Sequence, residues 1–202
     1  MSAARFAAVW VVAALAGCAV APTAQELDRE ALAMIKASFR DQGIAKVDRL
    51  QQDEGQSECS SDKPPSESVA RRIEAQALAT IKPPTGGQYL GDWREGEKIA
   101  QSGRGSANGG NCYNCHQIDR KEVSYGTIGP SLWNYGKLRG VKDPADPASA
   151  AIVQYTWGKL WNSKAYAACS NMPRFGHAKV LDETQLQHLM SLLLDPKSPV
   201  NQ

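Results

Sequence analysis

The residues best placed to do chemistry are Cys112, Cys115 and His116, which form the motif C-x-x-C-H. Two thiols at this spacing can each add to one vinyl group of a porphyrin, because the vinyl groups sit on neighbouring pyrroles. The adjacent histidine is thereby placed under the iron. The motif predicts one haem c, bound covalently through Cys112 and Cys115, with His116 as an axial ligand.

Two other interpretations of the cysteine pair have less support. A zinc site would need four ligands, and the sequence has no second C-x-x-C and no H-x-x-x-H. The remaining residues that could complete a zinc site are scattered along the chain: Cys169, His177 and His188. A thioredoxin-like redox motif would need a βαβ context, and no such pattern is visible.

The second axial ligand is expected well downstream, on a loop before the last helix, where Met172 is followed by a proline. A thioether in this position raises the reduction potential relative to a second histidine. Met172 could instead be a buried side chain that fills a gap. His177 is the serious rival as a ligand. Met190 lies in the apolar stripe of a predicted helix, where core packing is the better interpretation, and His188 stands beside that stripe.

His116 also needs an acceptor for its other ring nitrogen, because the hydrogen bond of that nitrogen orients a metal-ligating imidazole. A backbone carbonyl near Gly129-Pro130 is the candidate. An ordinary loop turn at Pro130 is compatible with this role, so the two interpretations do not compete.

The N-terminus has the pattern of a secretion signal, which we assign to residues 1–24. Arg5 supplies a positive charge, an apolar run follows over 6–15, and small residues come next. The stretch Leu15-Ala16-Gly17-Cys18 resembles a bacterial lipobox, in which the cysteine is lipidated and begins the mature chain. We therefore expect the mature protein in the periplasm, attached to a membrane only if Cys18 is lipidated.

Two other cleavage sites compete with the lipobox. Small residues at Ala19 and Ala21 suit ordinary signal peptidase, although Pro22 would then follow the cut. A cut after Ala24 is the third option. All three sites place the mature chain outside the cytoplasm.

The sequence has five cysteines, and two remain once Cys18 and the two haem-attaching cysteines are set aside. These two are Cys59 and Cys169. An oxidising compartment favours their pairing, and the bond would tie an N-terminal extension to the loop just before Met172. Two separate buried thiols, or a mixed disulfide with a partner, are the alternatives.

The rest of the pattern predicts an all-α protein in two parts: a helical extension with a linker over 25–87, and a haem domain with a C-terminal tail over 88–202. In the extension, helical spacing covers 26–40 and 66–82. The polar stretch 51–65 contains Cys59 and is predicted to be a loop. Prolines and glycines after the second helix form the linker.

Two capped helices bound the haem domain. The first follows Asp92, with Glu95 at the position that closes a capping box, and the last follows Asp182, with Gln185 in the same place. The last helix carries apolar residues at helical spacing: Leu186, Leu189, Met190 and Leu193. Between the two helices the sequence is rich in glycine, proline and aromatic residues and has little periodicity. We expect this stretch to be irregular and to be held by a bound prosthetic group.

Composition excludes several classes of function. The net charge is +2 and no run of lysines and arginines occurs, so nothing indicates nucleic-acid binding. Outside the N-terminus there is no apolar stretch of the roughly 20 residues that a membrane-spanning helix needs. No Ser-His-Asp, paired-carboxylate or phosphate-loop pattern is present.

These features together resemble the class I cytochromes c over about residues 88–194. The resemblance rests on the capped first helix, the C-x-x-C-H motif, Gly129-Pro130-x-Leu132, and a Met-Pro loop before the last helix. It implies the class I cytochrome c fold, to which this chain adds an N-terminal helical extension. It also implies that His116 is the proximal ligand, that Met172 is the distal ligand, and that the Pro130 carbonyl orients His116.

A narrower similarity is to the SoxX family, the monohaem subunits of the SoxAX cytochromes of bacterial sulfur oxidation. Three segments carry it: 126–132, 171–176 and the closing 194–201. The closing segment is the most distinctive, because generic cytochromes c end after their last helix. The extension is similar to the one that some members carry.

This similarity implies one subunit of an enzyme, the SoxAX L-cysteine S-thiosulfotransferase. SoxA carries the active-site haem of the heterodimer, which joins thiosulfate oxidatively to a cysteine of the carrier SoxYZ. The SoxX-type chain relays the electrons to a downstream acceptor cytochrome. The residues support a relay independently, since two axial side chains leave the iron no open position for a substrate. A free-standing periplasmic electron shuttle is the main alternative, and a ligand-binding haem protein would require Met172 to be displaceable.

Overall fold

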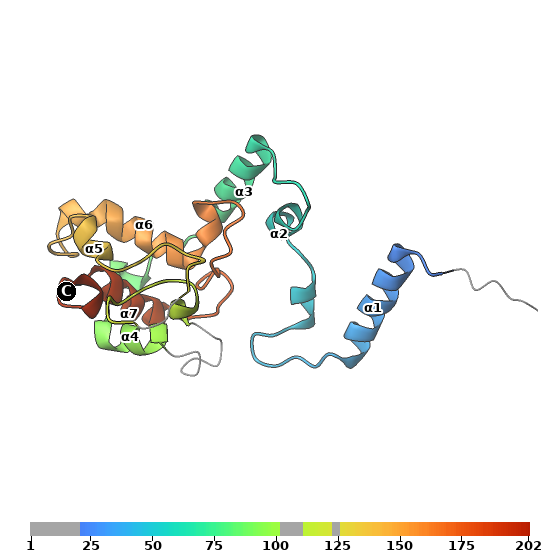
Figure 1. The fold of residues 1–202 in the computed structure, drawn as a ribbon, viewed down its shortest axis with the longest axis horizontal. Coiled ribbons are helices and arrows are strands. Elements are labelled where there is room, and N and C mark those ends of the chain that lie inside the picture. Colours follow the sequence, from blue (N-terminus) through green and yellow to red (C-terminus); the bar gives the residue numbers. More distant parts are fainter. Residues whose placement is uncertain (1–20, 102–110, 123–125) are drawn as a thin grey trace, which may run out of the picture. The chain divides into compact units, whose positions relative to one another are not determined.

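The computed structural model describes residues 21–101, 111–122 and 126–202, and these parts of the chain are helical (Figure 1). They contain no β-strand beyond an isolated bridge between Gln42 and Ala45, which agrees with the expected all-α class. No helix in these ranges is long and apolar enough to cross a bilayer. Residues 1–20 of the predicted signal sequence 1–24 lie outside the described residues.

The chain divides into two compact units, Met1–Arg40 and Asp41–Gln202. In the first unit, helix α1 spans Ala24–Ser38 and begins two residues before the predicted start. Thr23 caps it, and Glu26 closes a capping box with Thr23, which explains the earlier start. None of the α1 residues is buried, so the apolar stripe seen in the sequence is exposed.

The second unit contains a short helix that the sequence did not predict. Residues 51–65 were predicted to be a loop, but Glu54–Cys59 form helix α2, so that prediction is wrong. Asp53 caps the helix, and Gln56 closes a capping box with it. This pair was the available signal, and it was overlooked because a helix of 6 residues has no measurable apolar periodicity.

Helix α3 spans Glu67–Ala79, with Ser66 as its N-cap. Its buried residues, Ile73 and Ala77, are on the predicted apolar face. The segment after α3 is held by two tryptophans: the indole nitrogens of Trp161 and Trp157 donate to the carbonyls of Thr80 (2.9 Å) and Lys82 (2.7 Å). The extension after residue 40 therefore belongs to the same packed unit as the C-terminal part of the chain.

Two helices that lie far apart in the sequence cross closely. Helix α4 spans Trp93–Gln101 and helix α7 spans Glu183–Leu194. At the crossing, a Cβ on Gly96 would lie 2.2 Å from the carbonyl oxygen of His188, so only glycine permits this approach. The capping box predicted for α7 is confirmed, with Asp182 and Gln185 as its members.

The capping box predicted for α4 is wrong. Asp92 does accept a hydrogen bond from the backbone of Arg94, at 2.8 Å. Glu95, however, pairs with Lys98 at 2.7 Å and does not reach back. The backbone N–H of Asp92 donates instead to Nδ1 of His188, at 2.8 Å. A residue of α7 thus replaces the local acceptor, because the two helices lie so close together.

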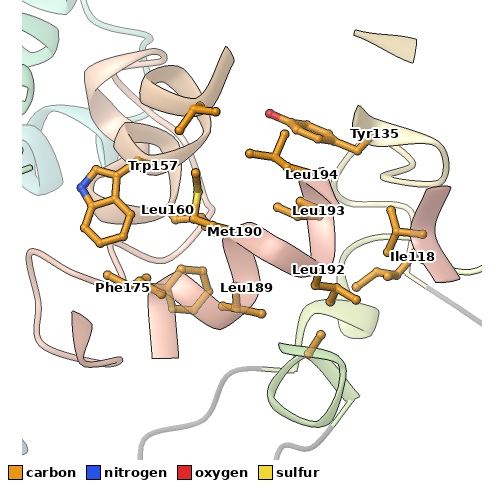
Figure 2. Packing of buried hydrophobic residues seen from close by; sticks show 14 of the residues in the cluster. Ile118, Tyr135, Trp157, Leu160, Phe175, Leu189, Met190, Leu192, Leu193 and Leu194 are labelled. Atoms are coloured by element: carbon orange, nitrogen blue, oxygen red, sulfur yellow. The ribbon is translucent and has the colours of Figure 1, made fainter. Parts of the chain in front are cut away.

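Helix α7 forms the centre of the core (Figure 2). Its predicted apolar residues are all buried, and Met190 has no exposed surface. This confirms core packing as the role of Met190. Around it lie aromatic and aliphatic side chains from other elements: Ile118, Tyr135, Trp157, Leu160 and Phe175.

The stretch between α4 and α7 is less irregular than predicted. Helix α6 covers Ala150–Trp161 and helix α5 covers Tyr135–Leu138. In α6 the buried residues recur at helical spacing: Val153, Thr156, Trp157 and Leu160. Apolar residues such as Tyr155 also occupy its other faces, and they hid the amphipathic contrast from which a surface helix is recognised.

The closing segment has a structural role centred on Asn201, which is 5% exposed. Its side-chain oxygen accepts hydrogen bonds from the backbone of Gly136 (2.9 Å) and Lys137 (3.1 Å) at the start of α5. Its side-chain nitrogen donates to the carbonyls of Leu193 and Asp195 at the end of α7, each at 3.0 Å. The side-chain amide of Asn201 therefore supplies hydrogen-bond partners both to N–H groups at the start of α5 and to carbonyl groups at the end of α7.

The predicted disulfide between Cys59 and Cys169 is present, with a Cα–Cα distance of 5.4 Å and a sequence separation of 110 residues. An ion pair reinforces it, since Nη1 of Arg174 lies 2.6 Å from a carboxylate oxygen of Asp53. Helix α2 is thus fixed to the segment that carries Met172.

Replacement of both cysteines by alanine is expected to lower the free energy of unfolding. A loop of this length corresponds to roughly 4–5 kcal/mol in the chain-entropy model, as an upper figure. Urea denaturation of the wild type and of Cys59→Ala/Cys169→Ala would measure the difference. Peptide mapping after alkylation is the control: if both residues are labelled without reductant, the bridge is refuted.

Candidate functional site

The C-x-x-C-H segment begins with a short 3-10 helix, Cys112–Asn114. The backbone N–H groups of Cys115 and His116 both donate to the carbonyl of Cys112, at 3.1 and 2.9 Å. This turn keeps the two cysteines and the histidine together. Both thiols are unpaired and partly buried. Burial, and secondarily the neighbouring Cys115, raises the pKa of the Cys112 thiol to about 11, so this thiol is protonated at neutral pH.

The imidazole of His116 is fixed from the opposite side by the loop 126–132. Its Nδ1 atom lies 2.7 Å from the carbonyl oxygen of Pro130, the acceptor that the sequence indicated. The loop is itself bonded to the motif, because Gly126 and Gly129 donate to the carbonyls of Tyr113 (2.9 Å) and Cys115 (2.8 Å). With Nδ1 engaged, Nε2 is the nitrogen left for a metal.

Gly129 sits directly against the imidazole. A Cβ at this position would lie 2.1 Å from Cε1 of His116 and 2.4 Å from its Nδ1. No side chain fits there while the ring keeps this position. The glycine is therefore required by the approach of the loop backbone to the histidine.

The donor set fits a covalently attached haem. Two unpaired thiols stand in one turn with a histidine whose remaining nitrogen is available. Cys112 and Met172 both pack against the same buried cluster, so the motif and the distal loop border one core. Cys112 and Cys115 would hold the group, and His116 and Met172 would be its axial ligands.

Met172 lies on a loop held by two serines. The hydroxyl of Ser163 donates to the Met172 carbonyl at 2.6 Å, and the Met172 N–H donates to the hydroxyl of Ser170 at 3.3 Å. The Met172 side chain is half-buried, whereas its rival His177 is exposed. Burial lowers the pKa of His177, Arg174 adds to this effect, and Asp53 opposes it. These positions favour Met172 over His177 as the residue directed to the interior.

Two of the three residues proposed as additional zinc ligands are engaged elsewhere. Cys169 is in the disulfide, and Nδ1 of His188 accepts the hydrogen bond from Asp92. Within 21–101, 111–122 and 126–202, no three histidine, cysteine or acidic residues are grouped as metal ligands would be. The geometry therefore gives the zinc interpretation no further support.

Sequence reasoning missed the polar residues that surround the Met172 loop. Arg174 binds Asp53, the backbone N–H of Ala168 donates to Glu74 (3.2 Å), and Arg49 donates to the carbonyl of Ala178 (2.8 Å). All three contacts join residues far apart in the sequence. Arg174 in the Met-Pro-Arg segment was visible, but nothing local indicated its partner.

Comparison with known proteins places the chain in a family. No protein-family model matches the sequence. A protein of Aquifex aeolicus (strain VF5), described as an uncharacterized lipoprotein, is 35% identical over 162 residues, which cover 74% of this chain and 73% of that protein. The chain belongs to the same family as this lipoprotein.

Gly129→Ala is expected to displace either the His116 ring or the loop, since the added methyl overlaps the imidazole. Overpacking of this kind costs about 1–3 kcal/mol, and the displaced histidine would reduce the amount of haem bound. Urea denaturation and haem staining per mole of protein would measure the two effects. Thr127→Ala, an exposed change in the same loop, is the control. Wild-type haem content in Gly129→Ala would contradict this account.

Proposed function

We propose that this chain is a class I c-type cytochrome with one haem c, attached through Cys112 and Cys115. His116 and Met172 are the axial ligands in this proposal, and the Pro130 carbonyl orients His116. The observation that carries the proposal is the 2.7 Å contact between Nδ1 of His116 and the Pro130 oxygen beside two unpaired thiols. A bound haem supplies one-electron oxidation and reduction.

The residues around the proposed group assign it electron transfer rather than bond-making chemistry. His116 and Met172 would occupy both axial positions, which leaves no place for a substrate on the iron. The loop carrying Met172 is held by Ser163, Ser170 and the disulfide, so the methionine is not free to swing away. A ligand-binding haem protein would need the opposite arrangement.

Covalent attachment is the first test. Mass spectrometry of the wild type should show the chain heavier by the mass of one haem. In Cys112→Ala/Cys115→Ala the added mass should be lost, because both thioether bonds are removed. Cys59→Ala/Cys169→Ala serves as the matched control, since it removes two cysteines and keeps the motif. Full covalent haem in the Cys112/Cys115 variant would refute the proposal.

Within this class, we propose a SoxX-type subunit of a SoxAX L-cysteine S-thiosulfotransferase. The support is the similarity of 126–132, 171–176 and the closing 194–201, together with what these segments do here. The first orients His116, the second carries Met172 and Arg174, and the third joins α5 to α7 through Asn201. The partners in this proposal are SoxA, the carrier SoxYZ and a downstream acceptor cytochrome.

The proposed location is the periplasm, with Cys18 as a lipid anchor. The Aquifex relative is described as a lipoprotein, which is compatible with an anchored envelope protein. The N-terminal cap of α1 disfavours only the cut after Ala24, which would remove Thr23 from its capping box with Glu26, whereas a cut after Ala21 would keep it. A cut before Cys18 leaves this cap complete.

The functional test is a reconstituted assay with SoxA, SoxYZ, thiosulfate and an acceptor cytochrome. We expect Met172→Ala to slow turnover, because loss of the thioether lowers the potential of the relay, and to leave association with SoxA intact. His177→Ala, an exposed change five residues along the same loop, should alter neither. Turnover without SoxA would contradict the relay, and failure to bind SoxA would indicate a free-standing electron shuttle.

A further inference from the structure

A polar pocket lies between the extension and the Met172 loop, and Met172 is one of its lining residues. Its volume is about 330 Å³. The α2 region contributes Gln52, Gln56 and Ser60, and the loop region contributes Lys164, Asn171 and Arg174. None of the lining residues comes from the haem motif or from the loop 126–132. We call this feature the Lys164 pocket.

The charge in the Lys164 pocket is unbalanced. Lys164 and Arg174 both line it, and no aspartate or glutamate is among the described residues of its wall. The nearest carboxylate, that of Asp53, is already engaged: it accepts from Nη1 of Arg174 at 2.6 Å and from the backbone of Gln56 at 2.7 Å. Two positively charged residues therefore line a wall that has no acidic residue among its described members.

Lys164 is the unusual residue of this group. Lys164 as a whole residue is 9% exposed, but its ammonium reaches the solvent of the pocket, and in the part of the chain that the structure describes it has no hydrogen-bond or ion-pair partner. All three N–H groups of the ammonium are therefore available to a ligand in the pocket. Burial lowers the pKa of Lys164; the Asp53 carboxylate opposes this, and Arg174 adds to it. The ammonium is thus held in a position where an anion would satisfy it.

The packing around Lys164 keeps the ammonium in place. A Cβ on Gly55 would lie 3.1 Å from the lysine Nζ, so the backbone of α2 lies directly against it. The disulfide and the Arg174–Asp53 pair fix α2 to the opposite wall. The guanidinium of Arg174 uses one of its five N–H groups on Asp53 and makes no other hydrogen bond among the described residues. Two cationic donors are therefore positioned before any ligand arrives.

We propose that the Lys164 pocket binds a small divalent oxyanion, of the class of sulfate and thiosulfate, between the Lys164 ammonium and the Arg174 guanidinium. Charge-assisted hydrogen bonds from both groups would hold its oxygens. The amide of Asn171 and the hydroxyl of Ser60 complete a polar wall. The volume leaves room for the anion and several bridging waters, which act nearly as well as direct contacts.

The test is isothermal titration calorimetry of the full holoprotein with sodium sulfate and with sodium thiosulfate, at ionic strength held constant with sodium chloride. The wild type should show saturable binding at one site. Lys164→Met keeps the length of the buried side chain and removes its charge, and it should weaken binding roughly tenfold or more. Lys164→Arg should retain binding. Lys63→Met removes an exposed lysine of the extension outside the pocket and should bind as the wild type does.

Absence of saturable binding by the wild type would overturn the proposal, and this result needs no variant. Equal affinity in the wild type and in Lys164→Met would overturn it as well, because the anion would then bind elsewhere. The readout is heat of binding and does not involve haem. Its failure therefore leaves the proposed electron transfer standing, because the anion site is made by Lys164 and Arg174 and not by a proposed haem ligand.

Discussion

The close crossing of α4 and α7 at Gly96 is the constraint on which the rest of the described domain depends. It brings the N–H of Asp92 to His188 and places α7 in the middle of the molecule. Helices α5 and α6 and the C-terminal tail then pack on α7. Because seven of the twelve residues of α7 are buried, a shift of this helix would disturb every element around it.

The extension after residue 40 is bonded to the rest of the second unit and helps to hold its fold. Its disulfide, the Arg174–Asp53 pair and the tryptophan contacts after α3 all end on the segment that precedes or carries Met172. The same contacts create the Lys164 pocket. Both proposed sites therefore include the loop that carries Met172. An anion bound beside Met172 would favour the oxidised state of a bound haem iron, because that state carries the larger positive charge.

The loop 126–132 gives the C-x-x-C-H motif what its own sequence cannot supply. In the proposed cytochrome the cysteines and the histidine of one turn would provide the bonds to haem, but the orientation of the imidazole comes from a carbonyl fourteen residues away. Gly129 makes that approach sterically possible. A relay also needs a ligand set that does not rearrange between oxidation states, and backbone contacts on both sides of the proposed haem provide this rigidity.

The sequence by itself determined what local chemistry controls: the C-x-x-C-H motif, the capped start of α7, the apolar stripe with Met190, and, by counting, the pairing of Cys59 with Cys169. It did not predict helix α2, which is too short to show periodicity, or helix α6, whose faces are nearly all apolar. It also wrongly predicted that Glu95 closes a capping box. Tertiary structure alone decided that His188 takes the Asp92 N–H, that Arg174 binds Asp53, and that Lys164 lines a pocket together with Arg174. The first two contacts join residues about 100 positions apart, and no local pattern encodes a partner at that distance, because only the packed core brings the two segments together.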